Sequence, residues 1–162
     1  LILYSLISLK LIKGKIIIFT DTIVHSYKLM LFLKSFSIPC LVLNPELPEN
    51  SRLKKIDSFK SNKAQILIST DDVNTKDDGD SRHFSASRGI DFINVETVIN
   101  FNFPPTISSY IHRVGRTARA NSVGIAFTLF TYENPELLVS LQSFIDKNSD
   151  SKLLPFKFRM DF

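Results

Sequence analysis

Tyr110-Ile111-His112-Arg113-Val114-Gly115-Arg116-Thr117-Ala118-Arg119-Ala120 is the stretch on which the interpretation of this chain depends. Three arginines, a histidine and a glycine fall within eight of its residues. Planar guanidinium groups with several N–H donors suit a phosphate better than a lone carboxylate. A solvated basic helix face is the simpler alternative. Gly115 argues against that alternative, because a glycine weakens a helix unless a backbone or a ligand comes close to it. The stretch therefore predicts phosphate binding.

A helical conformation over 108–118 would sort these side chains onto two faces. One face would be an apolar stripe with the i, i+4, i+7, i+11 spacing of a buried helix side, made of Ile107, Ile111, Val114 and Ala118. Another face would carry His112, Arg116 and Arg119, with Arg113 one turn before Arg116. We therefore expect a helix that holds guanidinium groups above a hydrophobic core.

Length and composition describe one compact domain. The chain has 162 residues, 44% of them hydrophobic, and a formal net charge of +4 with a pI near 9.2, which is compatible with nucleic acid but does not prove it. Its single cysteine, Cys40, excludes a disulfide framework and a cysteine zinc site, and we expect a buried thiol in a reducing compartment. No apolar run reaches the length of a membrane span, so we expect no membrane partner. The first residue is not Met, and we interpret the chain as a piece of a longer protein.

Short β-branched runs alternate with longer helical patterns along the chain. The runs predicted to be buried strands are Lys15–Phe19, Cys40–Leu43, Gln65–Ser69, Thr97–Phe101 and Gly124–Phe130. The predicted helices are Leu1–Leu11, Thr22–Phe36, Arg52–Phe59, Ser108–Ala118 and Glu136–Asn148. This alternation predicts an α/β fold with a mostly parallel sheet covered by helices on both faces. Ligands gather beyond the carboxyl ends of such strands, where the sequence places Thr20, Asn44, Thr70 and Asn102.

The segment 72–87 departs from this alternation. It is polar, it lacks apolar periodicity, and its four aspartates do not have the spacing of an EF-hand, so we expect a mobile surface loop and no metal site. The chain also has no Gly-x-x-x-x-Gly-Lys-Ser/Thr loop and no Asp-Glu-Ala-Asp. It therefore cannot cradle the phosphates of a nucleotide and hold Mg²⁺ by itself.

Four blocks of the sequence resemble superfamily 2 helicases, and specifically DEAD-box proteins. His112–Arg119 is similar to motif VI. Ser87-Arg88-Gly89-Ile90-Asp91 is similar to motif V, and Ser69-Thr70-Asp71 resembles the front half of that motif. Lys15–Thr20 resembles motif IV. The blocks occur in the order of the family and cover nearly the whole chain. Leu43–Arg52, the insertion after Asp71 and the ending Leu154–Met160 resemble the nucleolar branch that acts in large-ribosomal-subunit assembly.

The resemblance implies a RecA-like three-layer sandwich over residues 1–162, the second of two such domains. The preceding domain, with the Walker motifs, would bind ATP and supply most of the ligands of Mg²⁺. In this family the second and third arginines of motif VI, here Arg116 and Arg119, are arginine fingers for ATP hydrolysis. Arg113 and His112 would link the interface to the catalytic carboxylates of the other domain. Asp91 would accept hydrogen bonds from the ribose, and Gly89 would let the backbone approach the nucleotide, although a turn cap and a positive φ are the simpler explanations of these two residues.

For RNA, the resemblance implies contacts from Thr20, Thr70 and Arg52 to phosphate and 2′-hydroxyl groups, and hence binding that is independent of sequence. Two residues depart from the family: Glu49 stands at a glutamine position, and Asn44-Pro45 replaces His-Gly. Further expectations are a pre-ribosomal RNA partner, a monomer, and a location in the nucleus and nucleolus. Two alternatives stay open, a non-catalytic RNA-binding scaffold module and a DNA-acting superfamily 2 motor.

Overall fold

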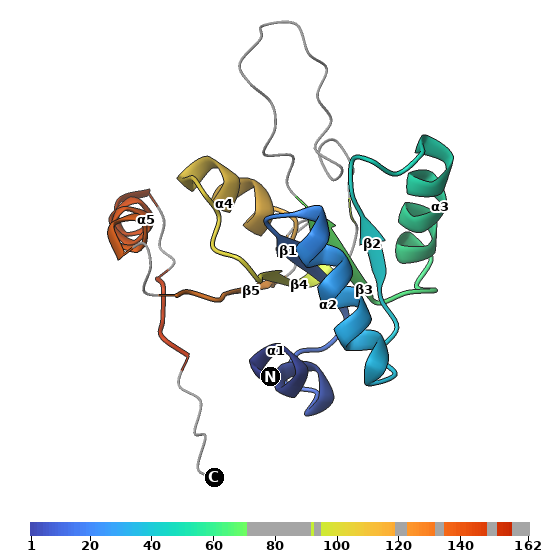
Figure 1. Ribbon diagram of the computed structural model, residues 1–162. Helices are drawn as coiled ribbons and strands as arrows, with labels where there is room; N and C mark the ends of the chain where they lie inside the picture. Colours follow the sequence, from blue (N-terminus) through green and yellow to red (C-terminus); the bar gives the residue numbers. More distant parts are fainter. Residues whose placement is uncertain (71–91, 93–94, 119–122, 132–134, 149–151, 157–162) are drawn as a thin grey trace, which may run out of the picture.

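The computed structural model describes residues 1–70, 92, 95–118, 123–131, 135–148 and 152–156 (Figure 1). The insertion 72–87, together with Gly89, Asp91 and Arg119, lies outside the described residues. The strands are β1 (Lys15–Thr20), β2 (Leu41–Leu43), β3 (Ile66–Thr70), β4 (Val95–Asn100) and β5 (Ile125–Thr128). They form a parallel five-stranded sheet in the order β2-β3-β1-β4-β5. The helices are α1 (Ile2–Ser8), α2 (Ile23–Ser35), α3 (Glu49–Lys60), α4 (Ile107–Val114) and α5 (Pro135–Asn148).

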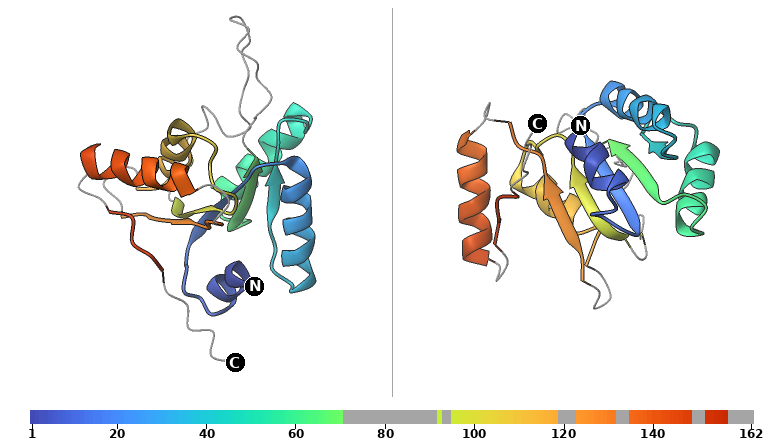
Figure 2. Two further views of the ribbon diagram at one scale, coloured as in Figure 1. Left: turned by 60° about the vertical axis from the view of Figure 1, so that its left-hand side comes forward. Right: turned by 90° about the horizontal axis from the view of Figure 1, so that it is seen from below.

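Helices cover both faces of the sheet because its central strands are apolar on both sides. All six residues of β1 are buried, and successive side chains of a strand point to opposite faces. Ile16 and Ile18 pack with α1 and α2, whereas Ile17 and Phe19 pack with α3 in a second cluster. Figure 2 shows these layers from two further directions. The predicted RecA-like three-layer sandwich is confirmed.

The amino edge of the sheet is fixed by a buried lysine. Lys15 opens β1 and is only 6% exposed, and its Nζ donates to the carbonyl of Lys60 at 2.9 Å, at the end of α3. The same Nζ lies 5.5 Å from the centre of the Phe59 ring. Burial lowers the pKa of this amine. The contact ties the end of α3 to the start of the central strand.

Two predictions about these elements were wrong. The helix expected over 108–118 ends at Val114, with Gly115 as its C-cap, and Ala118 has a positive φ of 54°. The expected stripe is therefore not a buried face, and Ile111 is 45% exposed. The last strand was expected to be buried, but β5 is the edge of the sheet and Ile125 is 49% exposed.

Within the described residues, none of the helices has the length and apolar character needed to cross a membrane.

Candidate functional site

Helix α4 carries the basic segment and has a well-defined beginning. The Thr106 side chain accepts a hydrogen bond from the Ser109 backbone N–H at 3.1 Å, which is the usual N-cap contact. The helix has eight residues and ends at Val114, with Gly115 as its C-cap. A Cβ on Gly115 would lie 2.9 Å from the carbonyl oxygen of Ile111, so the glycine is required by a close approach of backbone. The glycine at this position is therefore explained by nearby backbone, and it does not require a bound phosphate.

Arg113 points into the domain and not into solvent. It is 1% exposed, and its Nη1 donates to the carbonyl of Asn102 at 2.9 Å and to Oδ1 of Asn100 at 3.4 Å. The guanidinium carbon lies 5.4 Å from the centre of the Phe19 ring, in the geometry of a cation–π contact. Asn100 in turn donates from Nδ2 to the hydroxyl of Thr128 at 3.0 Å. Arg113 thus joins α4 to the carboxyl ends of β1, β4 and β5.

His112 and Arg116 lie nearer the surface than Arg113. His112 is exposed, and Arg116 follows the end of the helix and is half-buried. The surrounding sequence is strongly one-sided in charge, because no Asp or Glu occurs between Glu96 and Glu133. A cationic region without local carboxylates favours an anionic ligand. Earlier in the helix, burial raises the pKa of the Tyr110 hydroxyl.

The turn after α4 is attached to the amino end of β4. The hydroxyl of Thr117, which is 6% exposed, donates to the carbonyl of Val95 at 2.6 Å and lies 3.2 Å from the carbonyl of Glu96. Gly124 packs directly against this turn: a Cβ there would lie 2.3 Å from Oγ1 of Thr117 and 2.6 Å from the amide nitrogen of Ala118. The sequence argument had placed the chemistry at the carboxyl ends of the strands, whereas the arginine segment finishes at an amino end.

Thr20 and Thr70 meet at the carboxyl edge of the sheet. They are register partners at the ends of the neighbouring strands β1 and β3, and both are almost fully buried. Oγ1 of Thr20 lies 3.4 Å from the carbonyl of Thr22, whereas the buried Oγ1 of Thr70 and the buried Oγ of Ser69 have no hydrogen-bond partner among the residues that the structure describes. Buried hydroxyl groups are normally satisfied. Ser69 and Thr70 are consecutive residues of β3, so their hydroxyl groups lie on opposite faces of the sheet.

Arg52 and Glu49 both lie in the first turn of α3, which begins beyond the carboxyl end of β2. A helix N-terminus stabilises a carboxylate and disfavours a cation, so Glu49 is explained by its position and the half-buried Arg52 is not. Asn44, at the end of β2, is buried and uses both ends of its amide: Nδ2 donates to the Tyr27 hydroxyl at 3.2 Å, and Oδ1 accepts from the Glu46 N–H at 3.1 Å. Asn44 is a structural residue of this edge.

Thr117, Gly124 and Asn100 were missed by the sequence argument. Asn100 is the one that a pattern could have indicated, because it is a polar residue at the end of an apolar strand. Thr117 and Gly124 become visible only when α4 ends early and the chain turns back onto β4.

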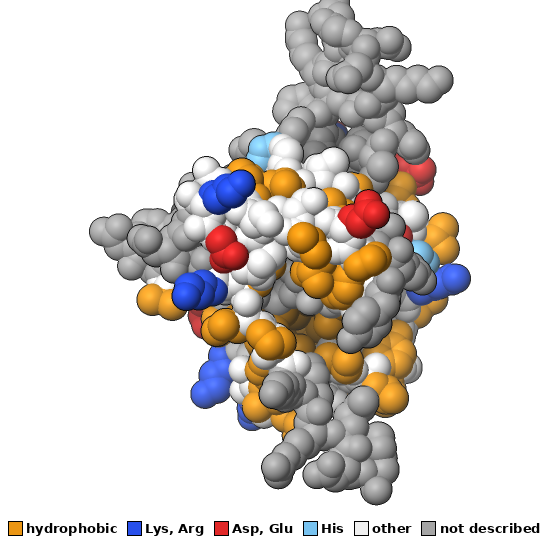
Figure 3. Space-filling view, turned by 90° about the vertical axis from the view of Figure 1, so that its left-hand side faces the viewer, with side chains coloured by type: hydrophobic (Ala, Val, Ile, Leu, Met, Phe, Trp, Pro, Cys, Tyr) orange, Lys and Arg blue, Asp and Glu red, His pale blue; other side chains and the backbone are white. Residues whose placement is uncertain are grey.

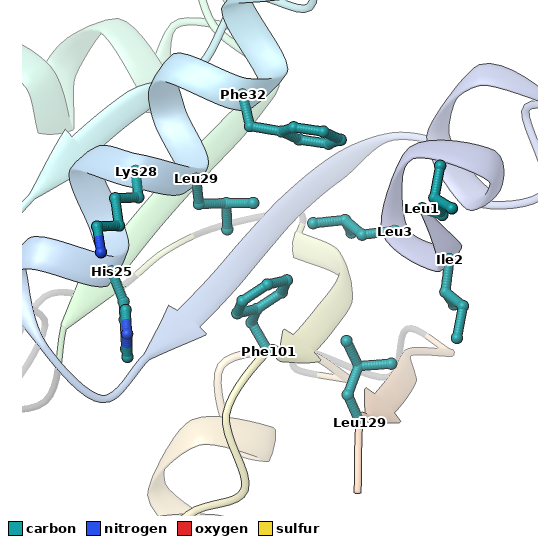
Figure 4. Close-up of a pocket in the computed structure, with 9 residues that line it drawn as sticks. All are labelled: Leu1, Ile2, Leu3, His25, Lys28, Leu29, Phe32, Phe101 and Leu129. Carbon is teal, nitrogen blue, oxygen red and sulfur yellow. The ribbon is translucent and has the colours of Figure 1, made fainter. Parts of the chain in front are cut away.

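An apolar hollow of about 690 Å³ lies on the face of the sheet that α1 and α2 cover, between these helices and the segments after β4 and β5 (Figure 4). Leu3, Leu29, Phe101 and Leu129 line it, with His25 and Lys28 among the lining residues. Figure 3 views the side of the molecule that carries α5, where hydrophobic side chains gather over the lower half. Exposed large apolar side chains on β5 and in the C-terminal part include Ile125, Val139, Leu154 and Phe156.

Comparison with known proteins matches this architecture and this order of motifs to one family. Residues 1–121 match the model of the helicase conserved C-terminal domain. The chain belongs to this family. It is 41% identical over 140 residues, covering 79% of the chain, to the ATP-dependent RNA helicase DBP9 of Yarrowia lipolytica, and 37% identical over 174 residues, covering 93% of the chain, to the DEAD-box ATP-dependent RNA helicase 16 of Oryza sativa subsp. japonica. The helicase domain described here spans about a quarter of each relative, 26% of both.

Solved structures agree with the assignment. The RNA helicase Prp28 from Chaetomium thermophilum, bound to ADP, superposes with a TM-score of 0.78 at 30% identity, over 93% of this chain and 34% of that one. Dbp5 from S. cerevisiae, bound to RNA and ADP BeF3, superposes with a TM-score of 0.69 at 28% identity, over 88% of this chain and 34% of that one. The helicase domain therefore has the RecA-like fold of DEAD-box C-terminal domains.

Proposed function

We propose that residues 1–162 are the C-terminal RecA-like half of a DEAD-box ATP-dependent RNA helicase, preceded in the full-length protein by the domain with the Walker motifs. One observation carries the proposal. The hydroxyl of Thr117 bonds to the carbonyl of Val95, so the turn after Arg116 lies against a strand that starts four residues after Asp91 in the sequence. The turn after Arg116 is thus held at the start of the strand that follows motif V in the sequence, which supports a nucleotide site shared by motifs V and VI.

Arg116 and Arg119 would act as arginine fingers. When the γ-phosphoryl group leaves ATP, negative charge spreads over its oxygens, and a guanidinium that crosses the interface between the domains stabilises that charge. Such a finger accelerates hydrolysis by about 10³–10⁵. Arg113 and His112 would connect the interface to the carboxylates of the other domain, and the burial of Arg113 among Phe19, Asn100 and Asn102 gives the end of α4 a rigid support for this task.

The basic side chains around the end of α4 suit the polyphosphate of ATP. The region from α4 to β5 is cationic and free of carboxylates in its sequence. In the part of the chain that the structure describes, no group of three His, Cys, Asp or Glu side chains could hold a metal. The ligands of Mg²⁺ would therefore come mainly from the preceding domain. Asp91 would hold the ribose hydroxyls, and Gly89 would leave room for the nucleotide.

RNA would lie along the carboxyl edge of the sheet. The buried, unpartnered hydroxyl of Thr70, its register partner Thr20 and the N-terminal turn of α3 with Arg52 all belong to this edge. Contacts from such groups to phosphate and 2′-hydroxyl carry no base specificity. The nucleotide and the RNA would thus occupy different edges of the same sheet, which allows one domain to respond to both.

The sequence features that resemble the nucleolar branch support a role on pre-ribosomal RNA of the large subunit, in the nucleus and nucleolus, and we propose that the protein acts there as a monomer. This part of the proposal rests on sequence likeness alone. Localisation of the tagged full-length protein and the RNA that crosslinks to it are the measurements that test it.

The reaction itself is tested with the purified full-length protein. We expect ATP hydrolysis that RNA stimulates and DNA of the same sequence does not, and we expect no turnover by residues 1–162 alone, which lack a P-loop. A protein that binds RNA but hydrolyses no ATP would establish the scaffold alternative. Stimulation by DNA instead of RNA would establish the DNA-motor alternative.

A further inference from the structure

Thr117 and Gly124 form a close contact between two segments of the chain. One segment is the turn that follows Arg116, and the other is the stretch that leads into β5. The two meet at the amino end of β4, where the Thr117 hydroxyl donates to the carbonyl of Val95 at 2.6 Å in a buried environment. A short, buried hydrogen bond of this kind fixes the position of the backbone that carries it.

The bare Cα of Gly124 is necessary for this arrangement. A Cβ there would come within 2.3 Å of the Thr117 hydroxyl oxygen and 2.6 Å of the backbone nitrogen of Ala118, and the second of these is backbone that cannot rotate away. Gly124 has no positive φ, so its requirement is for space and not for an unusual conformation. Any side chain there must displace the turn that begins at Arg116.

The turn itself has a conformation that its own sequence does not favour. Ala118 has a φ of 54°, a left-handed conformation that is unfavourable for a residue with a Cβ. The neighbouring hydrogen bond and close packing are what hold it there. Strain that surrounding contacts maintain next to a catalytic side chain is a means of preorganisation.

We infer that Thr117 and Gly124 are positioning residues for ATP hydrolysis, which together hold Arg116 where it meets the departing phosphoryl group. Neither residue touches the nucleotide in this account. The inference rests on the proposed function, because it requires Arg116 to be an arginine finger.

The test uses three variants of the full-length helicase at saturating ATP and RNA. Thr117→Val removes the hydroxyl at constant shape, and we expect a fall in kcat of about tenfold to a hundredfold, since a small misplacement of a catalytic group costs that much. Thr117→Ser keeps the hydroxyl and should retain most of the activity. Gly124→Ala should match Thr117→Val. Thr97→Val, which changes a second buried threonine, in β4 itself, is the matched control and should leave kcat unchanged.

Two further readouts separate positioning from general damage. The affinity for ADP and for RNA should stay within about twofold of wild type in Thr117→Val, whereas the affinity for ADP with aluminium fluoride, which mimics the transferred phosphoryl group, should fall with kcat. Combining Thr117→Val with Arg116→Ala should cost little beyond Arg116→Ala alone, because both act on one guanidinium.

Wild-type kcat in Thr117→Val, or losses that multiply in the double variant, would overturn the inference. An equal loss in Thr117→Ser, accompanied by a lower unfolding temperature, would assign the threonine a structural role only and would overturn it as well. If wild type itself showed no RNA-stimulated hydrolysis, the proposed function would fail before any variant is compared, so the two failures are distinguishable.

Discussion

At the scale of single residues, burial decides what each functional group can do. Arg113 and Arg116 have the same side chain and lie three positions apart, yet Arg113 is packed under α4 and Arg116 lies at its end. Helical spacing alone predicts that the two arginines are neighbours on one surface of the helix. Packing gives Arg113 partners inside the domain, whereas Arg116 lies beyond the end of the helix and is half-buried.

Cys40 provides a direct test of burial. The thiol is 7% exposed, and burial raises its pKa, an effect that the nearby Lys34 partly opposes. Because the thiolate is the reactive form, alkylation by iodoacetamide at pH 8 should be slower than in the urea-unfolded chain by about tenfold or more. A reaction at the same rate in both states would show that the thiol is not buried in the core cluster that it forms with residues of α2.

Arg52 is the residue for which an RNA contact can be measured. Arg52→Gln should weaken RNA binding by a similar factor across unrelated sequences, and the dependence of binding on salt should lose about one phosphate contact. Lys54→Gln removes one charge from the exposed surface of the same helix and is the control. An unchanged salt slope in Arg52→Gln, measured by titration at several salt concentrations, would remove Arg52 from the RNA surface.

At the scale of elements, the sheet followed from the sequence because its signal is local. Apolar β-branched runs of strand length between helical patterns leave few alternatives to parallel pairing, and parallel pairing alone brings Thr20 and Thr70 together. The end of α4 did not follow, because a tertiary contact decides it. The Thr117 hydroxyl bonds to the carbonyl of Val95 only after the chain has folded back onto β4. The two residues are 22 positions apart, so the 3.6-residue spacing of a helix cannot predict this bond.

The exposure of β5 could not be predicted for a similar reason. Its composition is that of a buried strand, and its place at the edge depends on the order of the strands in the sheet. The roles of Gly89, Asp91 and Arg119 stay predictions, since these residues lie outside the described part of the chain.

The N-cap of α4 should contribute measurably to stability. Thr106→Ala removes the acceptor for the Ser109 N–H and should lower the free energy of unfolding by about 1 kcal/mol. Ser108→Ala, an exposed position in the first turn of the same helix, is the control and should have a smaller effect. Urea denaturation of residues 1–162 gives both values, and equal effects of the two changes would refute the capping role.

At the scale of the whole molecule, the proposed function assigns two edges of one sheet to two ligands. The carboxyl edge holds the unsatisfied hydroxyl of Thr70 and the start of α3, and the amino edge of β4 holds the turn that follows Arg116. In the proposed mechanism, closure of the two RecA-like domains would bring the arginine side chains to ATP while RNA lies across the other edge. RNA would then stimulate hydrolysis by favouring the closed state.

The most direct test of this account is the ATP turnover of the full-length protein with Arg116→Ala, at saturating ATP and RNA. If Arg116 is a finger, turnover should fall by about 10³–10⁵ while folding and RNA affinity stay close to wild type, because the lost contact forms mainly in the transition state. Arg116→Lys should recover little, since an ammonium group does not reproduce the planar fork. Unchanged turnover, or a domain that no longer folds, would show that the motif VI segment is structural and would contradict the account.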